Sequence, residues 1–218
     1  MATPASDSPP RRSARAALTL LAAAVAGFGL VAVMHEATRD RIEAIARERT
    51  LASFREVLQG TAFDNDLLAD TTTVTDPELL GTARPVTVYR ARRRGETVAV
   101  VLAPVAPGGY AGSIDLLVGI APDGRLLGVR VTRHRETPGL GDAIDLRKSD
   151  WIRAFTGRSL GNPPLERWRV RKDGGDFDQF TGATVTPRAV VGAVADVLVY
   201  FERHRAELLA PPATIPPP

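Results

Sequence analysis

The first marked pattern along the chain is an uncharged, largely apolar stretch from Ala16 to Met34. Its length is close to the roughly 20 residues that a helix needs to cross a bilayer. A cleaved signal peptide is the alternative, but no Ala-x-Ala-like cleavage site follows the apolar core. The pattern therefore predicts an uncleaved transmembrane helix over residues 16–34, preceded by a flexible polar N-terminus over residues 1–15.

The charges on either side of this stretch predict its orientation. Arg11, Arg12 and Arg15 precede the apolar residues, and the positive-inside rule places them in the cytoplasm. Arg39 and Arg41 follow on the far side and weaken that signal. We expect the N-terminus in the cytoplasm and the bulk of the chain outside it.

Beyond the anchor, residues 35–82 are expected to form a helical stalk followed by a loop. Apolar residues recur there at three- and four-residue spacings among charged ones, at Ile42, Ile45, Leu51, Phe54 and Leu58. The C-terminal part of the stalk is expected to pack on the domain, with a partner surface as the alternative. Gly60–Thr82 is rich in Thr and Asp and predicts a loop.

Four apolar runs separated by turn signals predict β-strands. They are Val86–Tyr89, Val98–Leu102, Ser113–Ile120 and Leu126–Thr132. Asp123-Gly124, between the last two runs, is a strong hairpin signal, and Pro107–Tyr110 is predicted as a loop. Strands in this order predict a twisted antiparallel sheet with one face covered.

Two helices are expected after the sheet. Ser149–Thr156 is predicted as a short helix with Ser149 as its N-cap, and Pro187 to about Leu209 carries an apolar stripe that should lie on the sheet. Trp168–Val170 is a candidate for a further strand. Residues 210–218 form a proline-rich tail that is predicted to be disordered.

These elements predict the α+β class: a single N-terminal transmembrane helix, then an extracytoplasmic domain over residues 83–209 with a twisted antiparallel sheet packed by helices. The 218 residues, 44% apolar and 24% charged, suit one compact domain with appendages. The net charge of +3 is small, and no basic run with interleaved aromatic residues occurs, so nucleic acid is not an expected partner.

The chain contains no cysteine, which excludes disulfides, thiolate nucleophiles and Cys-ligated metal centres. Its three histidines, His35, His134 and His204, lie too far apart in sequence to indicate a metal motif. No metal site is therefore predicted. Any redox chemistry of this protein must come from an organic cofactor.

The segment Asp178–Pro187, just before the last helix, carries the candidate chemistry. Thr186 is expected as the N-cap and Pro187 at the first helical position. Free backbone N–H groups at the helix start would then lie near Thr184 and attract an anion, phosphate especially. On these grounds alone, an ordinary loop with a Thr-Pro cap remains the alternative.

The pattern Asp178-x-x-Thr181-Gly182-Ala183-Thr184 resembles the flavinylation motif of the FMN-binding domains in the G subunit of Rnf electron-transport complexes and the C subunit of sodium-pumping quinone reductases. The resemblance implies that Thr184 takes FMN as a phosphoester, transferred from FAD by a magnesium-dependent flavin transferase. Asp178 would be the acidic residue that the transferase recognises. Thr181, Gly182 and Ala183 would belong to the cofactor site.

The segment from Glu136 to Gly141, Glu-Thr-Pro-Gly-Leu-Gly, is similar to the second signature of these domains. In that family frame, Thr137, Leu140 and Gly141 are expected against the isoalloxazine ring. Glu136 is expected to bind backbone or ribityl groups, with a surface charge that holds its own loop as the alternative.

The segment Lys172–Asp178 and the short C-terminal tail resemble the Rnf subunit more than the quinone reductase subunit. Lys172 and Asp173 are candidate cofactor-binding residues within that segment. Lys172 would place positive charge near the flavin or its phosphate, and a solvated lysine is the alternative. Three aromatic residues nearby in the chain are expected in the core rather than against the ring: Trp151, Phe155 and Trp168.

The resemblance covers roughly residues 16–207 and implies an electron-carrier subunit with covalent FMN and no catalytic residues of its own. Its expected partners are the other membrane subunits of an Rnf-type complex, which link reduced ferredoxin and NAD to ion transport, together with the flavin transferase and membrane lipid. The expected location is the inner membrane, with the domain on the periplasmic side. Alternatives are the equivalent subunit of a sodium-pumping quinone reductase or another flavinylated chain, and a flavin-free anchored module for assembly or sensing.

Overall fold

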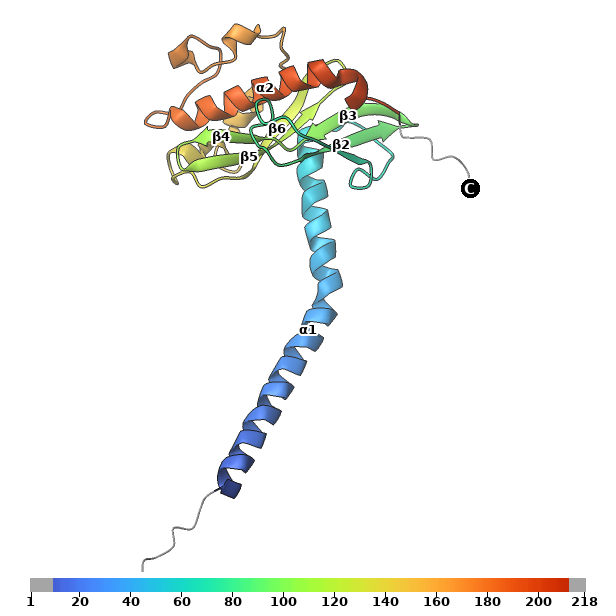
Figure 1. The fold of residues 1–218 in the computed structure, drawn as a ribbon. Coiled ribbons are helices and arrows are strands. Elements are labelled where there is room, and N and C mark those ends of the chain that lie inside the picture. The colour runs from blue at the N-terminus through green and yellow to red at the C-terminus, as the bar shows by residue number, and fades with distance from the viewer. Residues whose placement is uncertain (1–9, 212–218) are drawn as a thin grey trace, which may run out of the picture. The chain divides into compact units, whose positions relative to one another are not determined.

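The computed structural model of the protein describes the backbone of residues 10–211, and the side chains of residues 16–39, 41, 47, 48 and 50–211. The chain divides into two units, Met1–Thr50 and Leu51–Pro218 (Figure 1). Residues 1–9 and 212–218, for which the sequence predicts a flexible start and a disordered tail, lie outside the described residues.

The helix α1, Pro10–Leu58, contains the predicted anchor and the helical part of the predicted stalk as one element. It begins at Pro10, inside the segment for which the sequence predicts no regular structure. Within it, Ala16–Arg39 is long and apolar enough to cross a membrane. Its described side chains are exposed throughout this stretch, as the lipid-facing surface of a single span requires.

The second unit is built on a six-stranded antiparallel sheet. The sheet order is β1-β2-β3-β5-β4, with β6 paired to the other side of β5. The four predicted strands are therefore confirmed, in meander order, as β2, β3, β5 and β6. The strand bounds are β1 Thr71–Val74, β2 Val86–Arg93, β3 Glu96–Leu102, β4 Val105–Gly109, β5 Gly112–Ile120 and β6 Leu126–Arg133.

Two strands lie where the sequence predicts loops. The loop predicted for Gly60–Thr82 contains β1, whose β-branched residues suit a strand and pair with β2 at the sheet edge. The loop predicted at Pro107–Tyr110 overlaps β4. Its proline and glycine residues indicate a loop in the sequence. They are tolerated in β4 because it is an edge strand, which can contain a residue without an N–H group, and because its pairing is irregular between Ala106 and Gly109.

The segment between β6 and the last helix consists of turns and four short 3-10 helices. These are η1 Gly141–Ile144, η2 Asp150–Phe155, η3 Leu165–Arg167 and η4 Arg171–Asp173. The hydroxyl of Ser149 accepts a hydrogen bond from the Trp151 N–H, so the predicted N-cap is confirmed. The strand suggested at Trp168–Val170 is wrong, because Val170 makes only an isolated bridge to Phe177.

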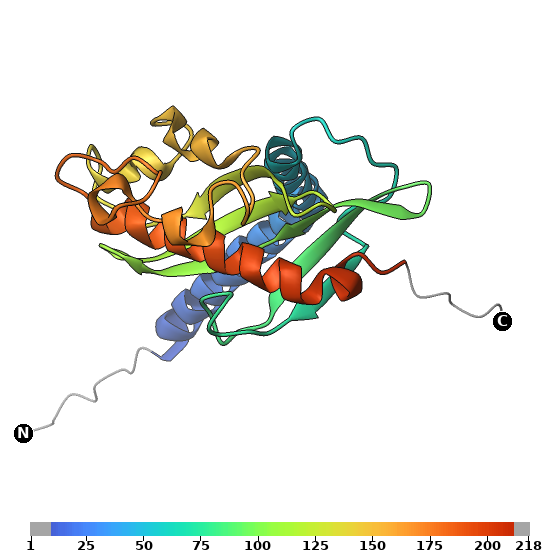
Figure 2. The same ribbon diagram turned by 90° about the horizontal axis from the view of Figure 1, so that it is seen from above.

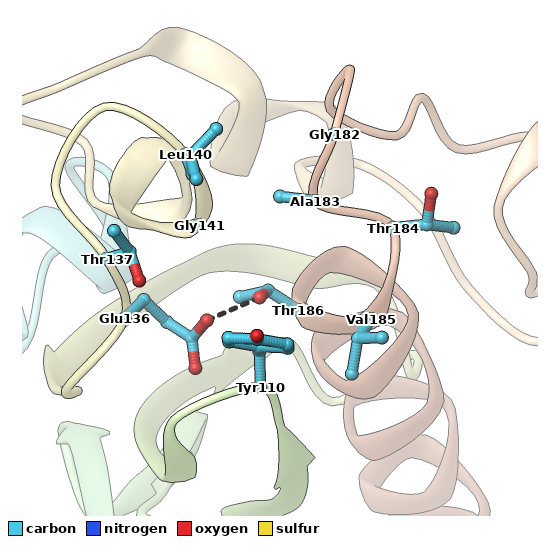
Figure 3. A pocket seen from close by; sticks show the side chains of 10 residues that line it. All are labelled: Tyr110, Glu136, Thr137, Leu140, Gly141, Gly182, Ala183, Thr184, Val185 and Thr186. Carbon is cyan, nitrogen blue, oxygen red and sulfur yellow. Dashed lines mark hydrogen bonds between the residues drawn. The ribbon is translucent and has the colours of Figure 1, made fainter.

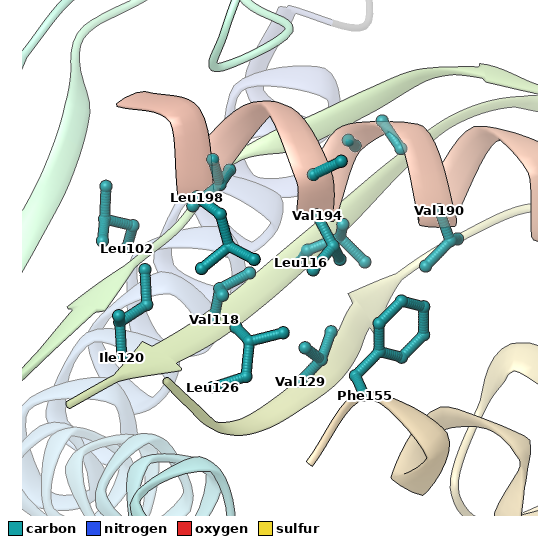
Figure 4. Close-up of a cluster of buried hydrophobic side chains, with 14 of the residues drawn as sticks. Leu102, Leu116, Val118, Ile120, Leu126, Val129, Phe155, Val190, Val194 and Leu198 are labelled. Carbon is teal, nitrogen blue, oxygen red and sulfur yellow. The ribbon is translucent and has the colours of Figure 1, made fainter. Parts of the chain in front are cut away.

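The helix α2, Val185–Leu208, runs across one face of the sheet (Figure 2). Its apolar stripe meets the inward residues of β5 and β6, and Figure 4 shows Val190, Val194 and Leu198 above Leu116 and Val118. Phe155 of η2 closes the same cluster. The sequence prediction that the last helix lies on the sheet is confirmed.

The other face of the sheet is also covered, so the expectation of a single covered face is wrong. Phe54, Val57 and Leu58, at the C-terminal end of α1, are buried against this face and confirm that the end of the stalk packs on the domain. Gly119 and Gly128 pair across β5 and β6 beneath them. A Cβ atom on either glycine would lie within 3 Å of the Val57 carbonyl oxygen, so these glycines permit the close approach of the helix.

The α+β class predicted from the sequence is therefore confirmed, with an apolar N-terminal helix and an antiparallel sheet packed by helices. One end of α2 and the loop that follows β6 lie together at one side of the sheet. The residues of both predicted cofactor motifs occur there.

Candidate functional site

A cavity of about 260 Å³ lies between the β4–β5 turn, the loop after β6 and the start of α2 (Figure 3). Its walls are mostly apolar, with hydroxyl groups and one carboxyl group among them. The lining residues are Tyr110, Glu136, Thr137, Leu140, Gly141, Gly182, Ala183, Thr184, Val185 and Thr186. The two sequence motifs, which more than 30 residues separate in the chain, thus form facing walls of one cavity.

A tight turn shapes the wall that carries Thr184. The Ala183 N–H donates a hydrogen bond to the Phe180 carbonyl at 3.1 Å. Gly182 occupies the turn with a φ of +83°, a left-handed conformation that favours glycine. Ahead of the turn, Trp151 Nε1 donates to the carbonyl of Asp178 at 2.7 Å, and the rings of Trp151 and Phe180 are 5.2 Å apart. The motif loop is therefore held by the aromatic core beneath it.

Thr184, and not Thr186, is the N-cap of α2, so the predicted helix start is wrong by two residues. The Arg188 N–H donates the first intrahelical bond to the Thr184 carbonyl at 3.2 Å. An N-cap oxygen usually accepts from the second or third helical N–H, but the third residue is Pro187, which has none. The Thr184 hydroxyl makes no capping bond, and in Figure 3 it points away from Leu140 and Thr137.

The helix start still offers donors to an anion beside Thr184. The N–H groups of Val185 and Thr186 belong to the first turn of α2, where N–H groups have no intrahelical acceptor. Together with the positive end of the helix dipole, they favour a negatively charged group at this point. Pro187 reduces the number of these donors without removing the site.

Thr186 has a structural role that its sequence position does not suggest. Its side chain is fully buried, and its hydroxyl donates to Glu136 Oε2 at 2.5 Å. Glu136 is itself only 5% exposed. The hydrogen bond, dashed in Figure 3, ties the start of α2 to the loop after β6.

Glu136 also holds the β4–β5 turn, which forms a third wall of the cavity. Its Oε1 atom accepts a hydrogen bond from the Ala111 N–H, in the β4–β5 turn, at 3.0 Å. Gly109 and Gly141 pack so closely on this side chain that a Cβ atom on either would lie within 3 Å of a Glu136 oxygen. One buried carboxyl group therefore joins the three segments that surround the cavity, and the alternative of a surface charge is wrong.

Four predicted site residues lie outside the cavity lining: Thr181, Lys172, Asp173 and Asp178. Lys172 is exposed, and its N–H donates to Gln179 Oε1 at 3.2 Å. The exposed carboxylate of Asp178 forms an ion pair with Arg171 at 3.0 Å. Asp178 and Thr181 belong to the motif loop, and Lys172 and Asp173 lie just before it in the chain, so none of the four lines the cavity.

Asp173, in η4, is bonded to α2. Arg188 donates two hydrogen bonds to its carboxylate, at 2.6 and 2.9 Å. These bonds, and the charge of Arg188, lower the pKa of Asp173 below its usual value. The pair links η4 to the first turn of the helix that carries Thr184.

The three aromatic residues near the site lie in or against the core, as predicted. Phe155 and Trp168 are buried, and Trp151 packs against the same core cluster. His134 lies in the loop after β6, where its Nδ1 atom accepts a hydrogen bond from the Glu136 N–H at 3.1 Å. Among the side chains that the structure describes, no group of three or more His, Asp or Glu residues is placed to hold a metal ion.

Sequence reasoning missed three lining residues. Tyr110 lies in a segment that the sequence predicts as a loop outside both motifs. Thr186 is assigned from the sequence to the helix cap, and Val185 is given no role. The sequence contains one signal for Tyr110: an aromatic residue between Gly109 and Gly112, where a chain turn exposes its side chain. No local pattern indicates the contact between Thr186 and Glu136.

Comparison with known proteins identifies the family. Residues 109–199, which include every residue that lines the cavity, match the model of the FMN-binding domain, and residues 3–57 match the model of the RnfG N-terminal region. The chain is 50% identical over 206 residues to the G subunit of the ion-translocating oxidoreductase complex of Pseudomonas aeruginosa, covering 94% of this chain and 96% of that protein.

The chain belongs to the RnfG family. The corresponding protein of Vibrio atlanticus is 47% identical over 195 residues, with 89% of this chain and 93% of the relative covered. That of Shewanella baltica is 45% identical over 184 residues, with 84% and 87% covered. RnfG membership decides against the alternative of a quinone reductase subunit.

The cavity fits the FMN that the family domain binds. Its apolar walls suit a flat aromatic ring, the hydroxyl groups suit a ribityl chain, and the start of α2 suits a phosphate. The volume is slightly below the ~300 Å³ at which enclosed ligand pockets begin, so FMN bound here would keep part of its surface outside the protein.

Proposed function

We propose that this protein is the electron-carrier subunit of a membrane-bound, ion-translocating ferredoxin:NAD oxidoreductase complex, with FMN attached to Thr184 through a phosphoester. The observation that carries the proposal is the position of Thr184. It is the N-cap residue of α2, it lines the cavity, and its hydroxyl is not used to cap the helix.

Attachment at Thr184 requires one group transfer. The Thr184 Oγ1 atom forms a bond to the FMN phosphorus of FAD, the pyrophosphate bond breaks, AMP leaves, and the hydroxyl proton is released. The exposed Asp178 carboxylate is the proposed recognition point for the transferase, six residues before the acceptor. Thr184 is only half-buried, which suits access by a second protein.

The residues of the cavity position the cofactor after transfer. The first N–H groups of α2 would bind the phosphate, and Thr137 would meet the ribityl chain or ring edge. Leu140 and Ala183 would pack against the isoalloxazine. When bound, FMN supplies reversible transfer of one or two electrons, while the protein supplies the tether and the electrostatic surroundings.

The membrane placement follows from α1. Its apolar stretch Ala16–Arg39 is proposed to cross the inner membrane once, in contact with lipid, with the N-terminus in the cytoplasm and Leu51–Pro218 on the periplasmic side. The other membrane subunits of the complex are the proposed partners, since the relatives are named as the G subunit of such a complex. A covalent tether would prevent loss of the flavin outside the cytoplasm.

The test is co-expression of the full chain with a flavin transferase, followed by denaturing electrophoresis under ultraviolet light and peptide mass analysis. A fluorescent band is expected, and the Thr184 peptide should gain the mass of FMN less one water. Thr184→Val should abolish both signals. Thr73→Val is the matched control, because Thr73 is an exposed threonine of β1 outside both motifs, and it should keep both signals.

The outcomes are distinct. A fluorescent band that survives Thr184→Val, or an unmodified Thr184 peptide in the presence of active transferase, refutes the linkage. A chain that carries FMN but does not co-purify with other membrane subunits after mild solubilisation contradicts the proposed place in a complex.

A further inference from the structure

We propose that Tyr110 is a flavin-contacting residue whose ring covers one face of the isoalloxazine, with Leu140 on the opposite face. Neither cofactor motif contains Tyr110, and it comes from the turn between β4 and β5. The inference rests on the proposed function, because it concerns FMN held at Thr184.

The exposure of large apolar side chains points to this surface. Among the described residues of Leu51–Pro218, the exposed large hydrophobic side chains are Tyr110, Leu140, Leu165 and Val185. All except Leu165 line the cavity that contains Thr184. Tyr110 is 75% exposed and Leu140 47% exposed. Single exposed apolar residues are ordinary, but a group around a concave site marks a surface that binds an apolar partner.

The backbone that carries Tyr110 is held firmly although its side chain is exposed. Gly109 and Gly112 pair across the turn, and the Ala111 N–H is bound by the buried Glu136 carboxyl group. A Cβ atom on Gly109 would overlap the Gly112 carbonyl oxygen and would lie 2.9 Å from Glu136 Oε1. The close packing fixes where the Tyr110 side chain leaves the backbone.

The two proposed contacts lie on different walls of the cavity. Figure 3 shows the Tyr110 ring nearly edge-on, between Glu136 and Val185, with Leu140 across the hollow from it. A flat ring system between them would meet an aromatic face on one side and a branched apolar side chain on the other. Offset stacking of aromatic rings is favourable beyond the area that it buries.

Glu136 sets this spacing through its two oxygens. One oxygen binds the turn that carries Tyr110, and the other binds Thr186, two residues from the attachment point. The position of the stacking residue and the position of the tether are thereby linked through one buried side chain. Tyr110 is the contact residue in this arrangement, and Glu136 is a positioning residue.

Flavin fluorescence tests the contact directly. A tyrosine in van der Waals contact with an excited flavin donates an electron to it and quenches its emission, so wild-type flavinylated protein should emit weakly. The full chain, co-expressed with flavin transferase and purified in detergent, is compared with Tyr110→Leu and Tyr110→Phe at equal flavin content. Emission should rise several-fold in both variants, because neither leucine nor phenylalanine is a comparable electron donor.

Quenching by iodide in solution separates stacking from electron donation. Tyr110→Leu should increase the access of iodide to the flavin, whereas Tyr110→Phe should keep it near the wild-type value because the covering ring remains. Leu140→Ala should also increase access. Leu165→Ala is its matched control, because Leu165 is likewise 47% exposed but lies outside the cavity, and it should change nothing.

The exposed position of Tyr110 means that its truncation leaves no internal void, and thermal unfolding should confirm that both variants are folded. Emission and iodide access that are unchanged in Tyr110→Leu overturn the inference and leave the proposed function standing. Absence of FMN from Thr184 in the wild-type chain overturns the proposed function and this inference with it.

Discussion

The hydrogen bond between Thr186 and Glu136 allows a quantitative test of how the cavity is held together. Thr186→Val preserves the shape of the side chain and removes only the hydroxyl group. Because both partners are buried and the bond is 2.5 Å long, Glu136 Oε2 would lose a donor that water does not easily replace. Leaving a buried polar group without its hydrogen-bond partner costs about 1–3 kcal/mol, which sets the expected loss.

This loss converts to a measurable change in melting temperature. For a unit of the size of Leu51–Pro218, 1 kcal/mol corresponds to about 2–4 °C, so Thr186→Val should lower the melting temperature by about 2–12 °C. The assay is thermal unfolding of the full chain in detergent, followed by circular dichroism. Thr184→Val is the matched control, since the same change two residues earlier removes no capping bond and should cost less than about 0.5 kcal/mol.

A second background makes the test specific to this pair. In a Glu136→Leu variant, Thr186→Val should have little further effect, because the acceptor is already absent. The reasoning is refuted if Thr186→Val melts within a degree of the wild type. It is equally refuted if the substitution costs the same in both backgrounds.

Two further predictions concern the walls of the site. Gly141→Ala should destabilise the protein by about 1–3 kcal/mol, because the new Cβ atom would lie 2.5 Å from Glu136 Oε2. In the control Gly192→Ala, in α2, the new Cβ atom meets no atom within 4 Å, so this variant should be neutral or stabilised by up to about 1 kcal/mol. Equal melting temperatures for the two variants would contradict this prediction. Since Arg188 lowers the pKa of Asp173, that carboxylate contributes stability above the usual Asp pKa of about 3.9, and the contribution is lost as the pH falls through the lowered value. Arg188→Gln should therefore melt below the wild type at neutral pH and approach it in acid, and a difference that stays constant from neutral pH to pH ~3 would count against the pair.

Local patterns predicted much of the fold because their physical causes are local. The Asp123-Gly124 turn joins β5 and β6, and the apolar stripe of α2 meets the sheet, both as the sequence indicates. Ser149 caps η2 because the acceptor and the N–H lie two residues apart. In each of these cases, spacing along the chain already determines which groups can meet.

Other features were invisible in the sequence because they depend on packing. Nothing near Gly119 or Gly128 indicates that a helix backbone approaches them, since Val57 comes from a distant part of the chain. The covered second face of the sheet follows from this contact. Likewise, the proline and glycine residues of β4 predict a loop, but its pairing with β5 makes it a strand.

The sequence by itself determined that a helix begins close to Thr184, although it placed the N-cap two residues too late, at Thr186. It also contained the two motifs by which the chain resembles FMN-binding domains. Only the tertiary structure decided that Glu136 and Thr186, 50 residues apart, form one buried pair, and that Tyr110 stands at the same cavity. The physical reason is that a helix start or a turn is specified by neighbouring residues. The walls of a cavity are specified by contacts between segments that meet only after the sheet and α2 have packed together.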